Sequence, residues 1–240
     1  MREREPAGRE AVTPERQRRE RPRAARRITP RDEQLLAWLA RQRFATAAQI
    51  AARFGIGVNR CARRLGELAA AGLVDRQQPF LAPSVYLVTP AGLGVADSGL
   101  PPPRLDLRTF RHDRGVTELV VAFELQGERL VTEREMRSAE ASGETRYSAR
   151  LVDTAADLPR RHFPDLVLVR ASGGAVAVEL ELTSKRTRRL KAILRAYRRA
   201  TEIGSVVYYS DNATLRRRIE QLASELHLDG RLEVRRWETR

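Results

Sequence analysis

The sequence predicts an α+β or α/β protein of two folded units, the first mainly helical and the second built on a mixed β-sheet. Residues 29–98 carry three helix-start signals, followed by two short strand patterns around a turn-rich segment. Residues 161–200 predict a strand, a turn, a strand and a basic amphipathic helix. Between these regions, residues 99–108 are rich in proline, and we expect the domain boundary in this stiff linker.

Charge is the strongest feature of the composition. The 240 residues carry 45 basic and 31 acidic side chains, a formal net charge of +14, and nucleic acid is the simplest partner for such a surplus. Only Lys185 and Lys191 are lysines, so a genome that favours arginine codons can account for part of the basicity. The single Cys61 excludes a disulfide within the chain.

No apolar run approaches the ~20 residues of a membrane span, and the charged N-terminus does not resemble a secretory signal. We therefore expect a soluble, cytoplasmic protein without membrane contact.

Residues 1–28 mix arginine and glutamate with almost no apolar side chains. Such a stretch cannot bury enough surface to offset the entropy lost on ordering, so we expect a disordered basic arm. Two roles are open for it. It is either a solvated tail or an arm that follows DNA phosphates with its densest part, residues 16–27.

Capping signals predict the helices of residues 29–98. Thr29 can cap a first helix that has Pro30 in its first turn. Thr46, with Gln49 three residues later, forms a capping-box pattern for a second helix. A third helix is predicted over residues 58–71, with Cys61, Leu65 and Leu68 inward and Asn59, Arg60, Arg63, Arg64 and Glu67 outward.

A hairpin and a short helix complete the first unit. Leu73–Val74 and Val85–Val88 are predicted strands, and Thr89 starts a helix that ends near Ala96. Three helices plus a hairpin, with exposed arginines on the third helix, follow the winged helix-turn-helix plan. The stretches FATAAQIAARFGIGVNRCARRLGELAAAGLV and VYLVTPAG resemble that family.

This resemblance implies that Asn59, Arg60, Arg63 and Arg64 face the major groove of double-stranded DNA and that Arg76 lies in the wing. Each of these side chains could instead contact phosphate or belong to a solvated helix face. Some winged helices bind protein rather than DNA, because fold alone does not determine function.

The second unit, residues 109–240, is predicted to begin with a helix over about residues 110–126, in which His112 shares a stripe with apolar residues. We expect a strand at 129–137 and a long loop or partly formed strand pair at 138–159. After the 161–200 region follow a strand at 206–210, a helix at 213–226 and a strand at 232–237.

Three carboxylates are expected to gather on one face of the predicted hairpin. In the strand Ala175–Thr183, Glu179 and Glu181 share a face opposite the apolar side chains, and Asp165 lies across the turn. Two such carboxylates at the end of an apolar strand are unfavourable unless they contact cations, water or a metal.

The order helix, strand, strand, strand, helix, strand resembles the restriction-endonuclease-like, or PD-(D/E)-x-K, superfamily. By this resemblance Asp165 and Glu179 hold Mg²⁺, which prefers oxygen ligands and activates water. A magnesium-dependent DNA endonuclease is therefore one hypothesis. Glu181 stands at the superfamily's lysine position, so Lys185 is the candidate replacement, and His112 is either a further candidate base or a core histidine.

An inert alternative is equally consistent with the pattern. Glu179 and Glu181 could form ion pairs with arginines of the following helix, on whose buried face Tyr197 is expected. The outward arginines of that helix, including Arg188 and Arg195, could follow a phosphate backbone.

Together with the first unit and the proline linker, the segments HDRGVTELVVAFE, HFPDLVLV and VELELTSKRTRRLKAILRAY resemble the replication-relaxation family of actinobacterial plasmids and integrative elements. This implies a double-stranded DNA-binding accessory protein for replication or relaxation, with a nuclease-like domain that is non-catalytic or weakly catalytic. Relaxases, replication proteins and a second copy in a homodimer are further possible partners. A winged-helix transcriptional regulator is the remaining alternative.

Overall fold

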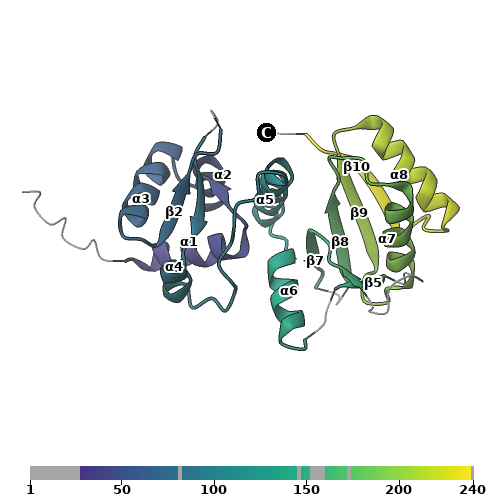
Figure 1. The fold of residues 1–240 in the computed structure, drawn as a ribbon, viewed down its shortest axis with the longest axis horizontal. Helices are drawn as coiled ribbons and strands as arrows, with labels where there is room; N and C mark the ends of the chain where they lie inside the picture. Colours follow the sequence, from purple (N-terminus) through teal and green to yellow (C-terminus); the bar gives the residue numbers. More distant parts are fainter. Residues whose placement is uncertain (1–27, 81–82, 145–146, 152–159, 172–173, 239–240) are drawn as a thin grey trace, which may run out of the picture.

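The computed structural model describes residues 28–80, 83–144, 147–151, 160–171 and 174–238 (Figure 1). Apart from Ile28, the predicted basic arm lies outside these residues. None of the helices in the described ranges combines the length and apolar content that a membrane crossing requires.

The N-terminal unit, residues 29–98, consists of helices packed on a small antiparallel sheet of order β1-β3-β2. The predicted helices and the hairpin are present, and a two-residue strand that the sequence did not indicate adds to the hairpin. The elements are α1 (Pro30–Arg41), β1 (Ala45–Thr46), α2 (Ala47–Phe54), α3 (Val58–Ala70), β2 (Val74–Gln77), β3 (Val85–Val88) and α4 (Pro90–Val95).

Local capping determines where these helices begin. The Thr29 side chain accepts from the backbone N–H of Asp32, and the Asp32 carboxylate accepts in return from the Thr29 N–H at 2.8 Å. Thr46 and Gln49 form the same reciprocal pair at the start of α2. Each box satisfies backbone donors that a helix start otherwise leaves without partners, and both predicted starts are confirmed.

The C-terminal unit, residues 109–238, is built on a mixed five-stranded sheet of order β10-β9-β8-β7-β4. Strand β9 runs parallel to β8 and β10, whereas β7 runs antiparallel to β8 and β4. Its elements are α5 (Phe110–Leu125), β4 (Leu130–Thr132), α6 (Glu133–Ala141), β5 (Ala149–Leu151), β6 (Arg160–His162), β7 (Leu166–Val169), β8 (Ala175–Leu180), α7 (Thr187–Arg199), β9 (Ser205–Ser210), α8 (Ala213–Glu225) and β10 (Leu232–Arg236).

Two assignments from the sequence need correction here. The strand predicted over residues 129–137 ends at Thr132, and residues 133–137 belong to α6, because Thr132 and Glu135 form a capping box. The region 138–159, predicted as a long loop or a partly formed strand pair, begins instead with the end of α6; the strand-pair alternative is confirmed in part, because β5 in this region pairs with β6. Residues 152–159 lie outside the described part.

Helices cover both faces of the large sheet. Helix α5 lies on the face toward the N-terminal unit, whereas α7 and α8 cover the opposite face (Figure 1). Helix α5 approaches β8 closely at Gly115, where an added Cβ would lie 2.5 Å from the Leu180 side chain and 2.9 Å from that of Trp237. Any larger residue here would displace the Leu180 or Trp237 side chain, so the close approach favours glycine.

The two units pack together without a break in the core, although a proline-rich segment joins them. One apolar cluster extends from Leu36 and Trp38 in α1, through Leu119 and Phe123 in α5, to Leu180 in β8. Helix α2 also packs on α5. The N-terminal unit thus covers α5 on the side that faces away from the sheet.

A buried carboxylate fastens this contact. The Glu124 side chain in α5 is 8% exposed and accepts hydrogen bonds from Trp38 Nε1 and Arg41 Nη1, both at 2.8 Å, and from Arg53 Nε. All three donors belong to α1 or α2. Charge-assisted bonds to a desolvated carboxylate are stronger than neutral ones, so Glu124 fixes the orientation of the two units.

Replacing Glu124 with alanine should lower the free energy of unfolding by about 2–4 kcal/mol, because two arginines and an indole N–H lose a buried acceptor. Chemical denaturation measures the change. The matched control is Glu128→Ala, which removes a more exposed pair with Arg170 and should change stability by less than about 1 kcal/mol. Equal stability of the two variants would show that Glu124 does not hold the units together.

Candidate functional site

The outer face of α3 presents the residues predicted to meet DNA. Asn59, Arg60 and Arg63 are exposed, while Cys61 and Leu65 face the core, as the spacing predicted. The exposed side chains of Asn59, Arg60 and Arg63 lie in the first two turns of α3.

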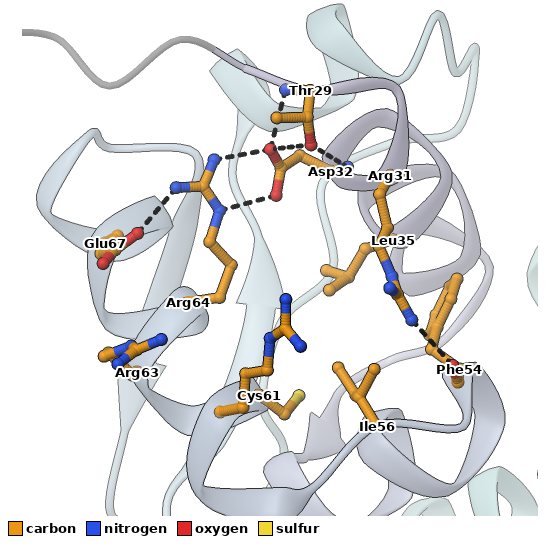
Figure 2. Close-up of a pocket in the computed structure, with 11 residues that line it drawn as sticks. Thr29, Arg31, Asp32, Leu35, Phe54, Ile56, Cys61, Arg63, Arg64 and Glu67 are labelled. Carbon is orange, nitrogen blue, oxygen red and sulfur yellow. Dashed lines mark hydrogen bonds and ion pairs between the residues drawn. The ribbon is translucent and has the colours of Figure 1, made fainter.

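Arg64 differs from its neighbours. Its guanidinium donates two bonds to the Asp32 carboxylate, at 2.7 and 2.5 Å, and a third to Glu67 at 2.7 Å (Figure 2). Burial raises the pKa of Asp32, but hydrogen bonds from Arg64 and Thr29 outweigh burial and lower the pKa overall. Arg64 thus holds α3 against the start of α1 and is only partly exposed, whereas Arg60 and Arg63 are exposed.

A cavity of about 480 Å³ lies between α1 and α3 (Figure 2). Its lining includes the apolar Leu35 and Ile56 and the cationic Arg31 and Arg60. Cys61 also lines it, and burial raises the pKa of this thiol to about 11, with Arg31 opposing the shift. The thiol therefore stays protonated at neutral pH and is a poor nucleophile.

The predicted wing residue, Arg76, lies in β2 opposite Tyr86 of β3. Its side chain is exposed, and Nε donates to Ser84 Oγ at 3.1 Å. The hairpin thus carries one cation at its surface, which is compatible with a phosphate contact.

Two acidic residues at the end of β8 are buried, and each contacts a basic side chain. They are Glu179, within the strand, and Glu181, which directly follows it. Glu179 accepts from the Tyr197 hydroxyl and pairs with His162 Nε2 at 2.6 Å. Burial raises the pKa of Glu179, but His162, Lys185 and the Tyr197 hydroxyl together outweigh burial and lower the pKa. Glu181 pairs with the Lys185 amine, and its pKa is raised because burial outweighs that attraction.

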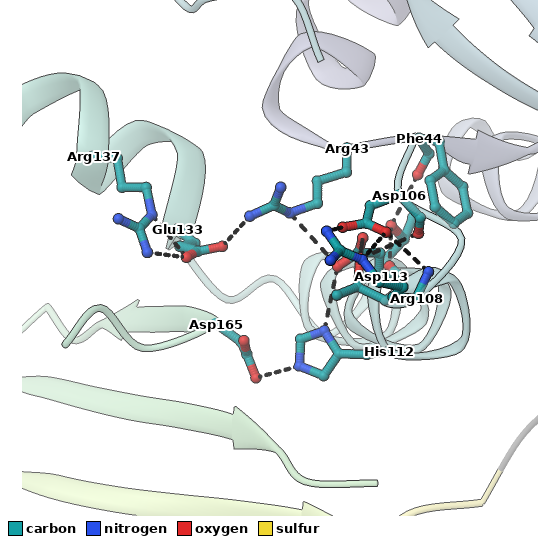
Figure 3. A network of polar contacts seen from close by, with 11 residues as sticks. Arg43, Phe44, Asp106, Arg108, His112, Asp113, Glu133, Arg137 and Asp165 are labelled. Carbon is teal, nitrogen blue, oxygen red and sulfur yellow. Dashed lines mark hydrogen bonds and ion pairs between the residues drawn. The ribbon is translucent and has the colours of Figure 1, made fainter. Parts of the chain in front are cut away.

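Asp165 belongs to a separate polar network. Its Oδ2 accepts from the backbone N–H of Leu180 at 2.7 Å and contacts His112 Nε2 at 3.2 Å. The other ring nitrogen of His112 lies 3.3 Å from Asp113 Oδ1, which is 3.6 Å from Arg43 of the N-terminal unit (Figure 3). The network therefore links the N-terminal unit to Asp165, just before the start of β7.

His112 is held in its protonated form by this network. Burial lowers the pKa of His112, but the attraction of Asp165 and the hydrogen bonds to Asp113 and Asp165 together raise it to about 10. At neutral pH the ring is an imidazolium, so it can donate from both nitrogens but cannot accept a proton as a general base.

The side chains in place do not fit the magnesium site that the nuclease resemblance implies. Asp165, Glu179 and Glu181 each have an oxygen in contact with a basic side chain of the protein, namely His112, His162 and Lys185 respectively. In the described ranges, no three His, Cys, Asp or Glu side chains are placed to hold a metal ion. Magnesium binding and the catalytic roles of Asp165, Glu179 and Lys185 stay predictions without support from this geometry.

Helix α7 separates its apolar and basic sides cleanly. Leu190, Ile193 and Tyr197 are buried against the sheet, whereas Arg188 and Arg195 are exposed, as predicted. The arginines of α7 thus form a cationic surface on the outside of the C-terminal unit, in addition to that of α3.

Sequence reasoning missed His162 and Arg43 as members of these networks. His162 lies in a three-residue strand whose partner, β5, is connected to it through a polar segment without periodicity. Arg43 reaches Glu133 at 2.7 Å across 90 residues of sequence. No local pattern marks either contact. Tyr197 was expected in the core, but not as the donor to Glu179.

A family model described as replication-relaxation matches residues 36–212, which is more than half of the chain and includes parts of both units. No curated protein matches the sequence.

The His112 imidazole should titrate near pH 10 in an NMR pH series of its ring protons. Because this pKa lies above the ordinary value of 6.5, protonated His112 stabilises the fold in full below pH 6.5, and the contribution is lost as pH rises through about 10. Asp165→Asn should lower the His112 pKa. The control, Asp211→Asn, removes the partner of Arg111 and should leave it unchanged. A His112 titration near pH 6.5 in the unmodified protein would contradict this network.

Proposed function

The chain belongs to the replication-relaxation family, and from this premise we propose that it is a double-stranded DNA-binding accessory protein in the replication or relaxation of a plasmid or mobile element. The N-terminal unit contacts the duplex, and the C-terminal unit is a nuclease-like scaffold without catalytic function.

The exposed face of α3 is the observation that carries the proposal. In a winged helix-turn-helix, residues near the start of the recognition helix reach base edges in the major groove, while the hairpin contacts the backbone. Asn59, Arg60 and Arg63 are exposed near the start of α3, and Arg76 lies on the hairpin, which supports the same use of this unit. Asparagine suits adenine and arginine suits guanine or phosphate.

The Arg64–Asp32 pair supports the same role indirectly. A helix that reads DNA must be held in a fixed orientation, because displacement of its side chains weakens their bonds to the bases. The bidentate bond to a carboxylate that is 5% exposed provides this support, and it joins the middle of α3 to the first turn of α1. We therefore assign Arg64 a positioning role and leave direct contact with DNA to Arg60 and Arg63.

The neutralised carboxylates support a non-catalytic C-terminal unit. Helix α5, strands β4, β7 and β8, helix α7 and strand β9 occur in the order expected of the nuclease-like plan, although α6, β5 and β6 stand between β4 and β7. The acidic positions of that plan, however, are engaged by His112, His162 and Lys185. These internal pairs would have to break before a divalent ion could bind. We therefore assign this unit a structural role as a scaffold.

Fluorescence anisotropy with a labelled duplex tests the proposal. Arg60→Ala combined with Arg63→Ala should weaken binding by at least about tenfold, and the slope of log affinity against log salt should fall by about 1 for each phosphate that the variant no longer binds. The control, Arg104→Ala, removes an exposed arginine from the segment between the units. No binding by the unmodified protein, or equal binding by the double variant, would refute the role of α3.

A further inference from the structure

The outside of the C-terminal unit carries a cationic surface that the proposed α3 interface does not use. Residues 186–199 include six arginines and one lysine and no acidic residue. Because Leu190, Ile193, Leu194, Ala196 and Tyr197 are buried, the basic side chains face outward. Arg195 and Arg199 are exposed, without a side-chain partner among the described residues.

Neighbouring elements extend this surface. Arg217 and Arg218 of α8 are exposed beside α7. At the end of α7, a cavity of about 520 Å³ is lined by Arg150, Arg161 and Arg199. Acidic groups compensate the charge only in part: Glu225 pairs with Lys191, Glu140 with Arg161, and Glu202 lines the cavity.

The two cationic surfaces lie at opposite ends of the molecule. Helix α3 packs on α2, α2 packs on α5, and α5 and α7 cover opposite faces of the sheet. Figure 1 shows these layers following one another along the longest axis, with α3 near one end and α7 and α8 near the other. With about 8–10 Å between packed helices and a similar helix-to-sheet spacing, α3 and α7 are roughly 35–40 Å apart.

This separation is fixed. Glu124 joins α5 to α1 and α2, and the Arg43–Glu133 and Arg41–Glu135 pairs join the N-terminal unit to α6. A straight duplex lying on the outer face of α3 therefore cannot also lie on the outer face of α7, because the rest of the molecule stands between them.

We propose that the outer face of α7 is a second duplex-binding surface and that the protein bridges two DNA segments, one at each end. The inference rests on the function proposed above for α3. Arginine forks match phosphate oxygens in pairs, and a helix side with several arginines and no acidic residue is complementary to a regular polyanion. The surface contacts phosphates, so we expect this end to bind without sequence preference.

A capture assay tests bridging. One duplex is fixed to beads, the protein is added, and retention of a second, labelled duplex is measured. The unmodified protein should retain the second duplex. Arg195→Glu with Arg199→Glu should still bind the fixed duplex through α3 but reduce capture of the second by at least about tenfold. The charge-matched control, Arg104→Glu with Arg129→Glu, changes exposed arginines elsewhere and should leave capture intact.

The outcomes separate this inference from the function on which it rests. If no duplex binds, the proposed function fails. If the unmodified protein binds one duplex but captures no second, or if the α7 variant captures as well as the unmodified protein, bridging through α7 is wrong. Equal capture by the α7 variant and the unmodified protein would favour an acidic protein as the occupant of the outer face of α7.

Sedimentation without DNA excludes the other route to capture, in which two copies associate and each uses its α3. We expect the unmodified protein and the α7 variant to have the same mass. A dimer that the α7 substitutions dissociate would overturn the proposal, since loss of capture would then reflect loss of the dimer.

Discussion

The buried Glu124 carboxylate is the contact on which the arrangement of the molecule depends. It accepts bonds from Trp38, Arg41 and Arg53, which come from two helices of the other unit. A desolvated carboxylate with several charged or polarised donors requires all of them to stay in place, because removal of any donor leaves buried charge uncompensated. Together with the apolar cluster that runs from α1 to β8, this contact makes one rigid body from two units that a proline-rich segment joins.

The acidic residues of the C-terminal unit are arranged differently from the ligands of a metal site. Each carboxylate that the nuclease resemblance singles out is matched by a basic residue from a different element: His112 from α5, His162 from β6, and Lys185 from the segment before α7. These ion pairs tie α5 and β6 to the sheet from both of its faces. The cluster thus connects the layers of the unit, and the same networks extend through Asp113 to Arg43 of the N-terminal unit.

The sequence predicted what depends on nearby residues. The caps at Thr29 and Thr46 and the amphipathic α7 follow from patterns within a few residues, and the β7–β8 pairing follows from two adjacent strand patterns. Helix α6 was missed although Thr132 and Glu135 form a capping box, because the apolar positions of residues 129–132 favoured a longer strand.

The partners of the buried charges could not be predicted. Glu124 meets residues 71 to 86 positions away, and Asp165 meets His112 at a separation of 53. Which basic side chain neutralises which carboxylate depends on how the layers pack, so no local pattern specifies it. The sequence placed Glu179 on the correct strand, but β8 ends at Leu180, so Glu181 lies just after it, and Asp165 lies just before β7. It also left open whether a metal or the protein itself balances the charge of these carboxylates.

Whether the two units keep a fixed orientation is tested most directly by pulsed electron–electron double resonance between two spin labels, one in each unit. Exposed positions Ala70 at the end of α3 and Ser224 in α8 can carry the labels, since the native Cys61 is buried. The account predicts one narrow distance distribution that is the same at low and high salt. A broad or multiple distribution would contradict it, because the units would then move independently and the two cationic surfaces would have no fixed separation.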